Sequence, residues 1–164
     1  MRHAKSSWNS SHLADHDRIL APRGQRAAEA LAAHVAGVEA PPALVLCSTA
    51  RRARETLEPV LARLPPTTEV LFEDDLYGAP APMILARLRE VPDATPTVLV
   101  VGHNPGLEDL AKGLGRDGDP GLIARVRTKF PTGALVTIAV HGPWEELGSV
   151  DATLEAFVVP ADLE

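Results

Sequence analysis

Short apolar runs alternate with amphipathic stretches along most of the chain. Ala43–Cys47 and Thr97–Val101 are continuous apolar runs, as is typical of strands buried on both faces of a parallel sheet. Val70–Phe72 predicts another strand, and Ala134–Val140 and Leu154–Val159 are the last strand candidates. A hairpin or short loop is expected between these last two, across residues 142–144.

Four stretches have the spacing of amphipathic helices: Pro22–Val35, about Thr49 to Pro59, Pro80–Glu90 and Asn104–Leu114. Pro22 suits a first helical turn, and Gly37 closes the first helix. Ser48 is expected to cap the second helix, which Pro59 should bend or end.

In the third helix the apolar residues are Met83, Leu85 and Leu88. The glycine-rich connection Lys112–Asp119 is interpreted as a turn. Alternating strands and helices predict one α/β domain over residues 1–164, a three-layer α/β/α sandwich. Its central sheet should be mostly parallel, with an antiparallel edge near the C-terminus.

Composition narrows the classes of function. A formal charge of −6 and a pI near 5.5 argue against a general nucleic-acid binder. No run is long enough to span a membrane and no secretion signal is evident, so the cytoplasm is the default compartment. The single cysteine, Cys47, excludes an internal disulfide, and its place at the end of an apolar run predicts a buried structural thiol.

Arginine stands near histidine in a pattern that suits phosphoryl transfer. Arg2-His3 is answered by Arg51-Arg52 and by Gly102-His103. A phosphoryl group in transfer carries charge on its oxygens, and arginine forks can hold these without a metal. A neutral imidazole is a good nucleophile, and nearby arginines favour the neutral form.

The predicted strands bring these residues together. His103 follows one apolar run, and the turn from Ser48 to Arg52 follows another. In parallel sheets, ligands bind beyond the carboxyl ends of the strands, so one shared site is expected.

The order of motifs resembles the histidine phosphatase superfamily, and within it the short SixA-type phosphohistidine phosphatases, which have a phosphoglycerate mutase-like fold. The resemblance rests on these segments: residues 2–8, Asp17–Leu20 with Arg23-Gly24, Ser48–Thr56, Gly102–Gly106 and Pro131–Ala134. It implies that His3 accepts the phosphoryl group and that Arg2 and Arg52 clamp phosphate. His103 would complete the pocket, and Arg52 is preferred over Arg51 because the spacing from Ser48 to Thr56 fits it.

In this superfamily an apolar strand at the middle of the sheet precedes the Arg-His pair. Only Met1 precedes it here, so we expect that strand to be missing from this chain. A nucleophile at such an end would be prone to fraying.

The resemblance implies phosphohistidine on a protein as the substrate, and neither metal nor organic cofactor is expected. Glu73 and Asp75 match poorly the acid that ester-cleaving members use, and a solvated acidic loop is the favoured interpretation. A phosphoimidazole departs with little proton donation. A broad phosphomonoesterase of small esters and a non-catalytic phospholigand-binding module remain alternatives, and a mutase is less favoured because the chain is short.

The loop Lys5–Asp17 is expected to line the mouth of the site. Its histidines, His12 and His16, are interpreted as solvated and not as a metal pair. For Asp17 and Arg18, a surface ion pair and support for the pocket are both open.

Overall fold

The central sheet consists of two three-stranded sheets joined by the first residues of the chain. In a computed structural model covering residues 1–164, β2 (Glu69–Glu73), β1 (Leu44–Ser48) and β3 (Val98–Val101) lie side by side in that order, all parallel. The second sheet has the order β4 (Asp117–Gly118), β6 (Ala152–Val158) and β5 (Leu135–Val140). β5 runs antiparallel to β6, which confirms the antiparallel edge.

Residues 1–3 lie between β3 and the start of β5. Arg2 forms a parallel bridge with Gly102, and the His3 N–H donates to the Gly102 carbonyl at 3.0 Å. On the other side, the Arg2 N–H donates to the Ala134 carbonyl at 2.8 Å, and the Gly133 N–H donates to the His3 carbonyl at 2.9 Å. Residues 1–3 therefore occupy the position in the sheet where the superfamily has its apolar strand, and they are hydrogen-bonded on both sides.

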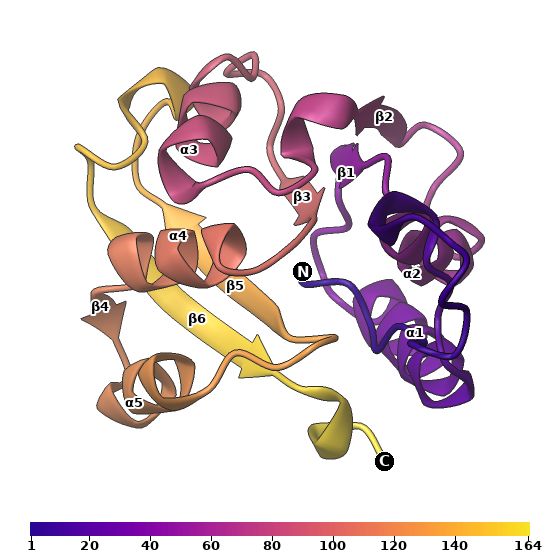
Figure 1. The fold of residues 1–164 in the computed structure, drawn as a ribbon. Helices are drawn as coiled ribbons and strands as arrows, with labels where there is room; N and C mark the ends of the chain where they lie inside the picture. The colour runs from indigo at the N-terminus through magenta and orange to yellow at the C-terminus, as the bar shows by residue number, and fades with distance from the viewer.

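Helices cover both faces of the sheet (Figure 1). α1 (Pro22–Ala36) and α2 (Arg51–Leu61) pack together on one face, while α3 (Ala81–Arg89), α4 (Gly106–Leu114) and α5 (Pro120–Thr128) lie on the other. Four single 3-10 turns complete the elements: η1 (Asp15–Asp17), η2 (Asp74–Leu76), η3 (Trp144–Glu146) and η4 (Pro160–Asp162). None of the helices is long and apolar enough to cross a membrane.

Two hydrophobic cores separate these layers. Along β1, Leu44 and Leu46 enter the core under α3, α4 and α5, whereas Val45 and Cys47 enter the core under α1 and α2. This alternation follows from the period of two in a strand, with both faces covered. The predicted three-layer α/β/α arrangement with a mostly parallel sheet is confirmed.

Some details of the sequence prediction were wrong. Val98 and Val100 of β3 are only half-buried, so this strand is not fully buried on both faces. In α3, Met83 is 52% exposed, and the neighbouring Ile84 packs into the core in its place. Of the two effects expected of Pro59, it does not end α2, which continues for two more residues to Leu61; a bend remains a prediction.

The sequence prediction also missed two elements in the region after α4. Instead of a plain turn, Lys112–Asp119 contains the end of α4 and the two-residue strand β4, which pairs with β6. α5 was not predicted, although Asp119 and Pro120 carry a helix-start signal. The Asp119 side chain accepts a hydrogen bond from the Leu122 N–H at 3.0 Å, and Pro120 is the first helical residue.

The connection between β5 and β6 is longer than a hairpin turn. It runs over residues 141–151 and contains η3, and Trp144 is anchored there by a hydrogen bond from its indole N–H to the Thr95 carbonyl at 2.8 Å. β6 begins two residues earlier than predicted, at Ala152.

Candidate active site

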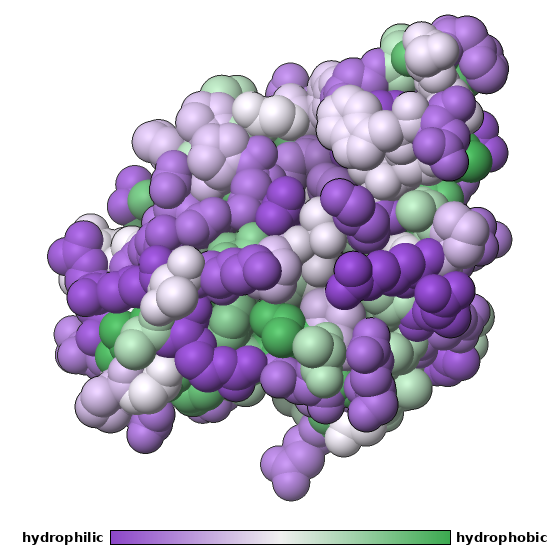
Figure 2. Space-filling model, turned by 60° about the horizontal axis from the view of Figure 1, so that its bottom comes forward, coloured by the Kyte–Doolittle hydropathy of each residue, from purple (hydrophilic) through white to green (hydrophobic).

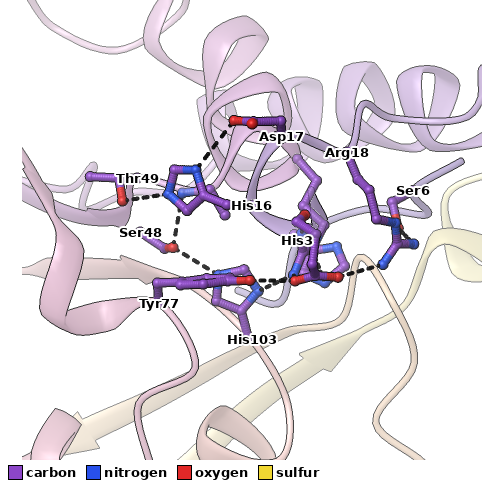
Figure 3. Close-up of polar contacts among 12 residues, drawn as sticks. His3, Ser6, His16, Asp17, Arg18, Ser48, Thr49, Tyr77 and His103 are labelled. Carbon is purple, nitrogen blue, oxygen red and sulfur yellow. Dashed lines mark hydrogen bonds and ion pairs between the residues drawn. The ribbon is translucent and has the colours of Figure 1, made fainter. Parts of the chain in front are cut away.

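Three of the four predicted site residues form one buried cluster at the carboxyl edge of the parallel strands. His3 ends the segment beside β3, His103 follows β3, and Arg52 lies in the first turn of α2, just after β1. Their exposed fractions are 7%, 6% and 6%. Figure 3 shows the His3 and His103 rings side by side, and their centroids are 5.2 Å apart.

The orientation of His3 leaves one ring nitrogen free of protons. Its Nδ1 lies 2.7 Å from the Ala4 carbonyl oxygen, and because a carbonyl can only accept, Nδ1 must carry the hydrogen. In the neutral ring Nε2 is then unprotonated, and its lone pair is directed toward Arg52. Arg52 Nε donates to it at 3.3 Å.

Arg52 is the hub of the cluster. Its guanidinium group contacts both histidines, with Nη2 3.5 Å from His103 Nδ1. The same group donates to Asp15, from Nη1 to the carbonyl oxygen at 2.7 Å and from Nη2 to Oδ2 at 3.1 Å. Arg51 points elsewhere: it is exposed and pairs with Glu55 at 2.8 Å.

His103 is positioned by Ser48, the last residue of β1. Its Nε2 lies 2.7 Å from Ser48 Oγ, which also accepts from the Ala50 N–H at 3.2 Å. Since Arg52 can only donate toward Nδ1, the hydrogen of the neutral His103 ring lies on Nε2. Ser48 thus has a different role from the predicted helix cap, because α2 begins at Arg51 without a side-chain cap.

Arg2, the fourth predicted site residue, makes no hydrogen bond to the cluster, but its charge acts on both histidines. Its Nη1 donates to the Phe130 carbonyl at 2.8 Å, while its Nε is buried and has no hydrogen-bond partner within the protein. Burial lowers the pKa of Arg2, and the negative charge of Glu108 partly offsets this.

Both histidines are kept neutral. Burial lowers the pKa of His3 to about 3; the hydrogen bond to the Ala4 carbonyl opposes this, while the positive charges of Arg52 and Arg2 lower the pKa further. Burial lowers the pKa of His103 to about 4, followed by the charge of Arg52. The neutral form was expected from the arginines, but burial is the larger cause.

Two residues at this site were missed in the sequence. Asp15 contacts Arg52, Arg18 (Nη1 to Oδ1 at 3.0 Å) and the Tyr77 hydroxyl, which donates to Oδ2. The Tyr77 ring packs edge-on against His103, with centroids 5.5 Å apart. Neither residue belongs to a motif, because both come from loops that only the fold brings to the arginines.

Arg18 supports the loop around the site. It is buried, donates to the Ser6 hydroxyl and the Ser7 carbonyl, and stacks on the exposed Trp8 ring at 3.3 Å. Its ionic partner is Asp15, not Asp17, so the structure favours pocket support over a surface pair.

His16 was expected to be solvated, but it forms part of the rim. It pairs with Asp17 at 3.5 Å, hydrogen-bonds Thr49 at 2.9 Å and packs edge-on against Tyr77 (Figure 3). His12 is exposed.

The two acids singled out in the sequence lie apart from the cluster. Glu73 is occupied by Arg87, at 2.8 to 3.0 Å, and Asp75 is exposed. Cys47 is fully buried, and burial raises the pKa of its thiol to about 12, as expected for a structural residue.

Comparison with known proteins agrees with this geometry. The sequence pattern of the histidine phosphatase superfamily (branch 1) matches residues 1–78. A solved structure of a candidate phosphohistidine phosphatase SixA from Nakamurella multipartitia is 34% identical, with a TM-score of 0.85 over 98% of this chain and 93% of that one. The chain belongs to the histidine phosphatase superfamily. Its SixA-type character and phosphoglycerate mutase-like fold, expected from the sequence, are confirmed.

Two further similar proteins match equally large parts of the chain. A candidate SixA from Agrobacterium tumefaciens is 27% identical, with a TM-score of 0.82 over 98% of this chain and 95% of that one. An uncharacterized protein of Mycobacterium leprae is 39% identical over 98% of this chain and 99% of its own length. As a histidine phosphatase superfamily member, this chain is a phosphatase.

Proposed function

We propose that this phosphatase removes the phosphoryl group from phosphohistidine on a protein, with His3 as nucleophile. The observation that carries the proposal is the position of Arg52, whose guanidinium group contacts His3 Nε2 and approaches His103 Nδ1. One buried cation thus spans the nucleophile and the second histidine, where the oxygens of a phosphoryl group would need donors.

In the first step, His3 Nε2 attacks phosphorus in line. A bond forms between Nε2 and phosphorus while the bond to the leaving imidazole breaks; that ring is protonated at its other nitrogen in the substrate, so it takes the electron pair and leaves as neutral imidazole. His3 becomes a phosphorylated imidazolium, and the Ala4 carbonyl 2.7 Å from its Nδ1 stabilises the new positive charge. Water then attacks phosphorus, the bond to Nε2 breaks, and inorganic phosphate leaves with neutral His3 restored.

Arg2, Arg52 and His103 would stabilise the charge on the phosphoryl oxygens in both steps. The Arg2 Nε hydrogen lacks an acceptor in the protein, and a buried donor in this state costs about 1–3 kcal/mol. A phosphoryl oxygen would satisfy it.

The ionised state of Asp15 at neutral pH supports phosphohistidine over alkyl phosphates as substrate. Asp15 is the acid that touches the cluster, and the hydrogen bond from Tyr77 lowers its pKa, with Arg18 and Arg52 adding to the effect. It is therefore ionised at neutral pH and poorly suited to protonate an alkoxide. An imidazole leaving group does not need such an acid.

The test compares phosphate release from a phosphohistidine peptide and from an aryl phosphate, using the wild type, His3→Ala and His12→Ala. We expect faster turnover of the peptide, complete loss in His3→Ala, and no change in His12→Ala because that histidine is exposed outside the cluster. Acid-labile phosphate on the wild type, absent from His3→Ala, would identify the intermediate. Turnover of the aryl ester alone would instead indicate a phosphomonoesterase, and binding of phosphate without turnover would indicate a binding module.

A further inference from the structure

A groove of about 490 Å³ lies beside the phosphate cluster and takes no part in the chemistry above. Its walls come from the start of α1, the end of α5 with residues 129–132, the end of β6, and η4. The floor is apolar, with Ala27, Phe157, Val159 and Pro160. Figure 2 brings the bottom of the molecule in Figure 1 forward and shows apolar patches (green) between hydrophilic side chains (purple) on that face.

The rim of the groove is positively charged. Lys5, Arg23, Arg125 and Lys129 line it, and no carboxylate does, although the protein as a whole has a charge of −6. Arg125 is paired with Asp162 at 2.7 Å. Lys5, Arg23 and Lys129 are exposed and form no ion pair within the protein, so they are available to a partner.

The walls of the groove are continuous with the segments that carry the phosphate site. Lys5 comes two residues after His3. On the opposite wall, the Phe130 carbonyl that precedes Pro131 accepts from Arg2, and the Gly133 N–H that follows Thr132 donates to the His3 carbonyl. The groove therefore lies within a few residues of His3, near enough for a segment that flanks the phosphorylated residue of a substrate.

We propose that this groove binds an acidic segment flanking the phosphorylated residue of a protein substrate, which rests on the function proposed above. Carboxylates of the segment pair with Lys5, Arg23 and Lys129, and an apolar side chain packs on Val159 and Pro160, which are only partly buried. The three cations lie on exposed, flexible side chains, so each contributes only modestly to the binding free energy. Together they favour negatively charged partners over positively charged ones.

The experiment uses two phosphohistidine peptides that differ only in having acidic or basic flanks, with phosphoramidate as a small substrate. The variant Arg23→Glu/Lys129→Glu reverses one charge on α1 and one just after α5. The matched control, Arg26→Glu/Arg127→Glu, changes the net charge equally on the same two helices but outside the groove, at exposed positions.

We expect the groove variant to raise KM for the acidic peptide by roughly tenfold with little change in kcat. Phosphoramidate turnover should not change, and the control variant should keep most of the affinity for the acidic peptide. Equal losses in both double variants, or no preference for acidic flanks in the wild type, would overturn the proposal. A loss confined to phosphoramidate would also overturn it and make the groove a small-molecule site.

Binding is measured separately from catalysis, by fluorescence anisotropy of the unphosphorylated acidic peptide. Should the chain not hydrolyse phosphohistidine, the proposed function fails, whereas the groove is judged by this measurement. Binding to the wild type that the groove variant loses supports the acidic partner, and equal binding to both contradicts it.

Discussion

At the scale of single residues, Asp15 binds the guanidinium group of Arg52, which we propose also holds the phosphoryl group. Its carboxylate holds Arg52 Nη2 at 3.1 Å and Arg18 Nη1 at 3.0 Å, and its backbone carbonyl holds Arg52 Nη1. The carboxylate fixes the guanidinium group in place, but its negative charge also opposes the binding of a phosphate dianion beside it.

Replacing Asp15 with asparagine should therefore tighten the binding of inorganic phosphate. The amide keeps the shape and removes the negative charge, so we expect the inhibition constant for phosphate to fall by roughly 2- to 10-fold. Competitive inhibition at constant pH and ionic strength measures this. Asp17→Asn is the matched control, since Asp17 has no contact with Arg52; an equal fall there, or weaker binding in Asp15→Asn, would contradict the prediction.

The sequence could locate the histidines and arginines of this site but not Asp15 or Tyr77. His3, Arg52 and His103 stand in motifs or directly after strand-like runs, so the rule for parallel sheets places them at one edge. Asp15 and Tyr77 reach that edge from a 3-10 turn and from the residue that follows another. Their approach depends on the paths of two loops, which hydrophobic periodicity does not encode.

At the scale of elements, α4 carries two glycines in contrasting surroundings. A Cβ at Gly106 would lie 2.0 Å from the Ala79 carbonyl oxygen, whereas one at Gly113 would meet nothing within 4 Å. Gly106 thus lets the start of α4, three residues after His103, pack against the backbone that leads into α3.

Alanine at these two positions should have opposite effects. Gly106→Ala must push α4 away from Ala79, and we expect it to destabilise the fold by about 1–3 kcal/mol and to lower activity by displacing His103. Gly113→Ala should stabilise it by up to about 1 kcal/mol through helix propensity. Urea unfolding of both variants provides the measurement, and a neutral Gly106→Ala would show that the contact relaxes freely.

Elements were predictable where their own sequence was decisive. β1 is buried at every position and reads as a continuous apolar run, so it was found within a residue of its limits. α5 was missed because it buries only Val126, which gives little apolar periodicity, and only its Asp-Pro start marks it. Met83 was assigned to the core because apolar character alone does not tell which side of α3 faces the sheet.

At the scale of the whole molecule, the neutral histidines tie stability to pH. An unfolded histidine takes up a proton below its ordinary pKa of 6.5, whereas folded His3 does so only below about 3. Between these values the unfolded state binds more protons, so the free energy of unfolding rises with pH and is lost as the pH falls from 6.5 toward 3. His103, with its pKa lowered to about 4, acts in the same direction.

His3→Asn should reduce this dependence on pH. Between pH 7.5 and pH 5, the wild type should lose up to about 2 kcal/mol more stability than the variant, because asparagine does not titrate. Denaturant unfolding at the two pH values measures the difference, and His12→Asn should behave as the wild type does. If His3→Asn lost as much as the wild type, His3 would titrate in the folded protein much as it does in the unfolded chain.

The position of residues 1–3 sets the order in which this protein can become active. These residues pair with Gly102 and Ala134, about a hundred or more positions away along the chain. Such distant contacts are costly to close and tend to form late in folding. Residues 1–3 are synthesised before Gly102 and Ala134, so they cannot pair with both until the polypeptide beyond Ala134 has been made. With His3 as the proposed nucleophile, the chain completes its sheet and positions this histidine in the same event, and copies that stop before Ala134 are expected to be inactive.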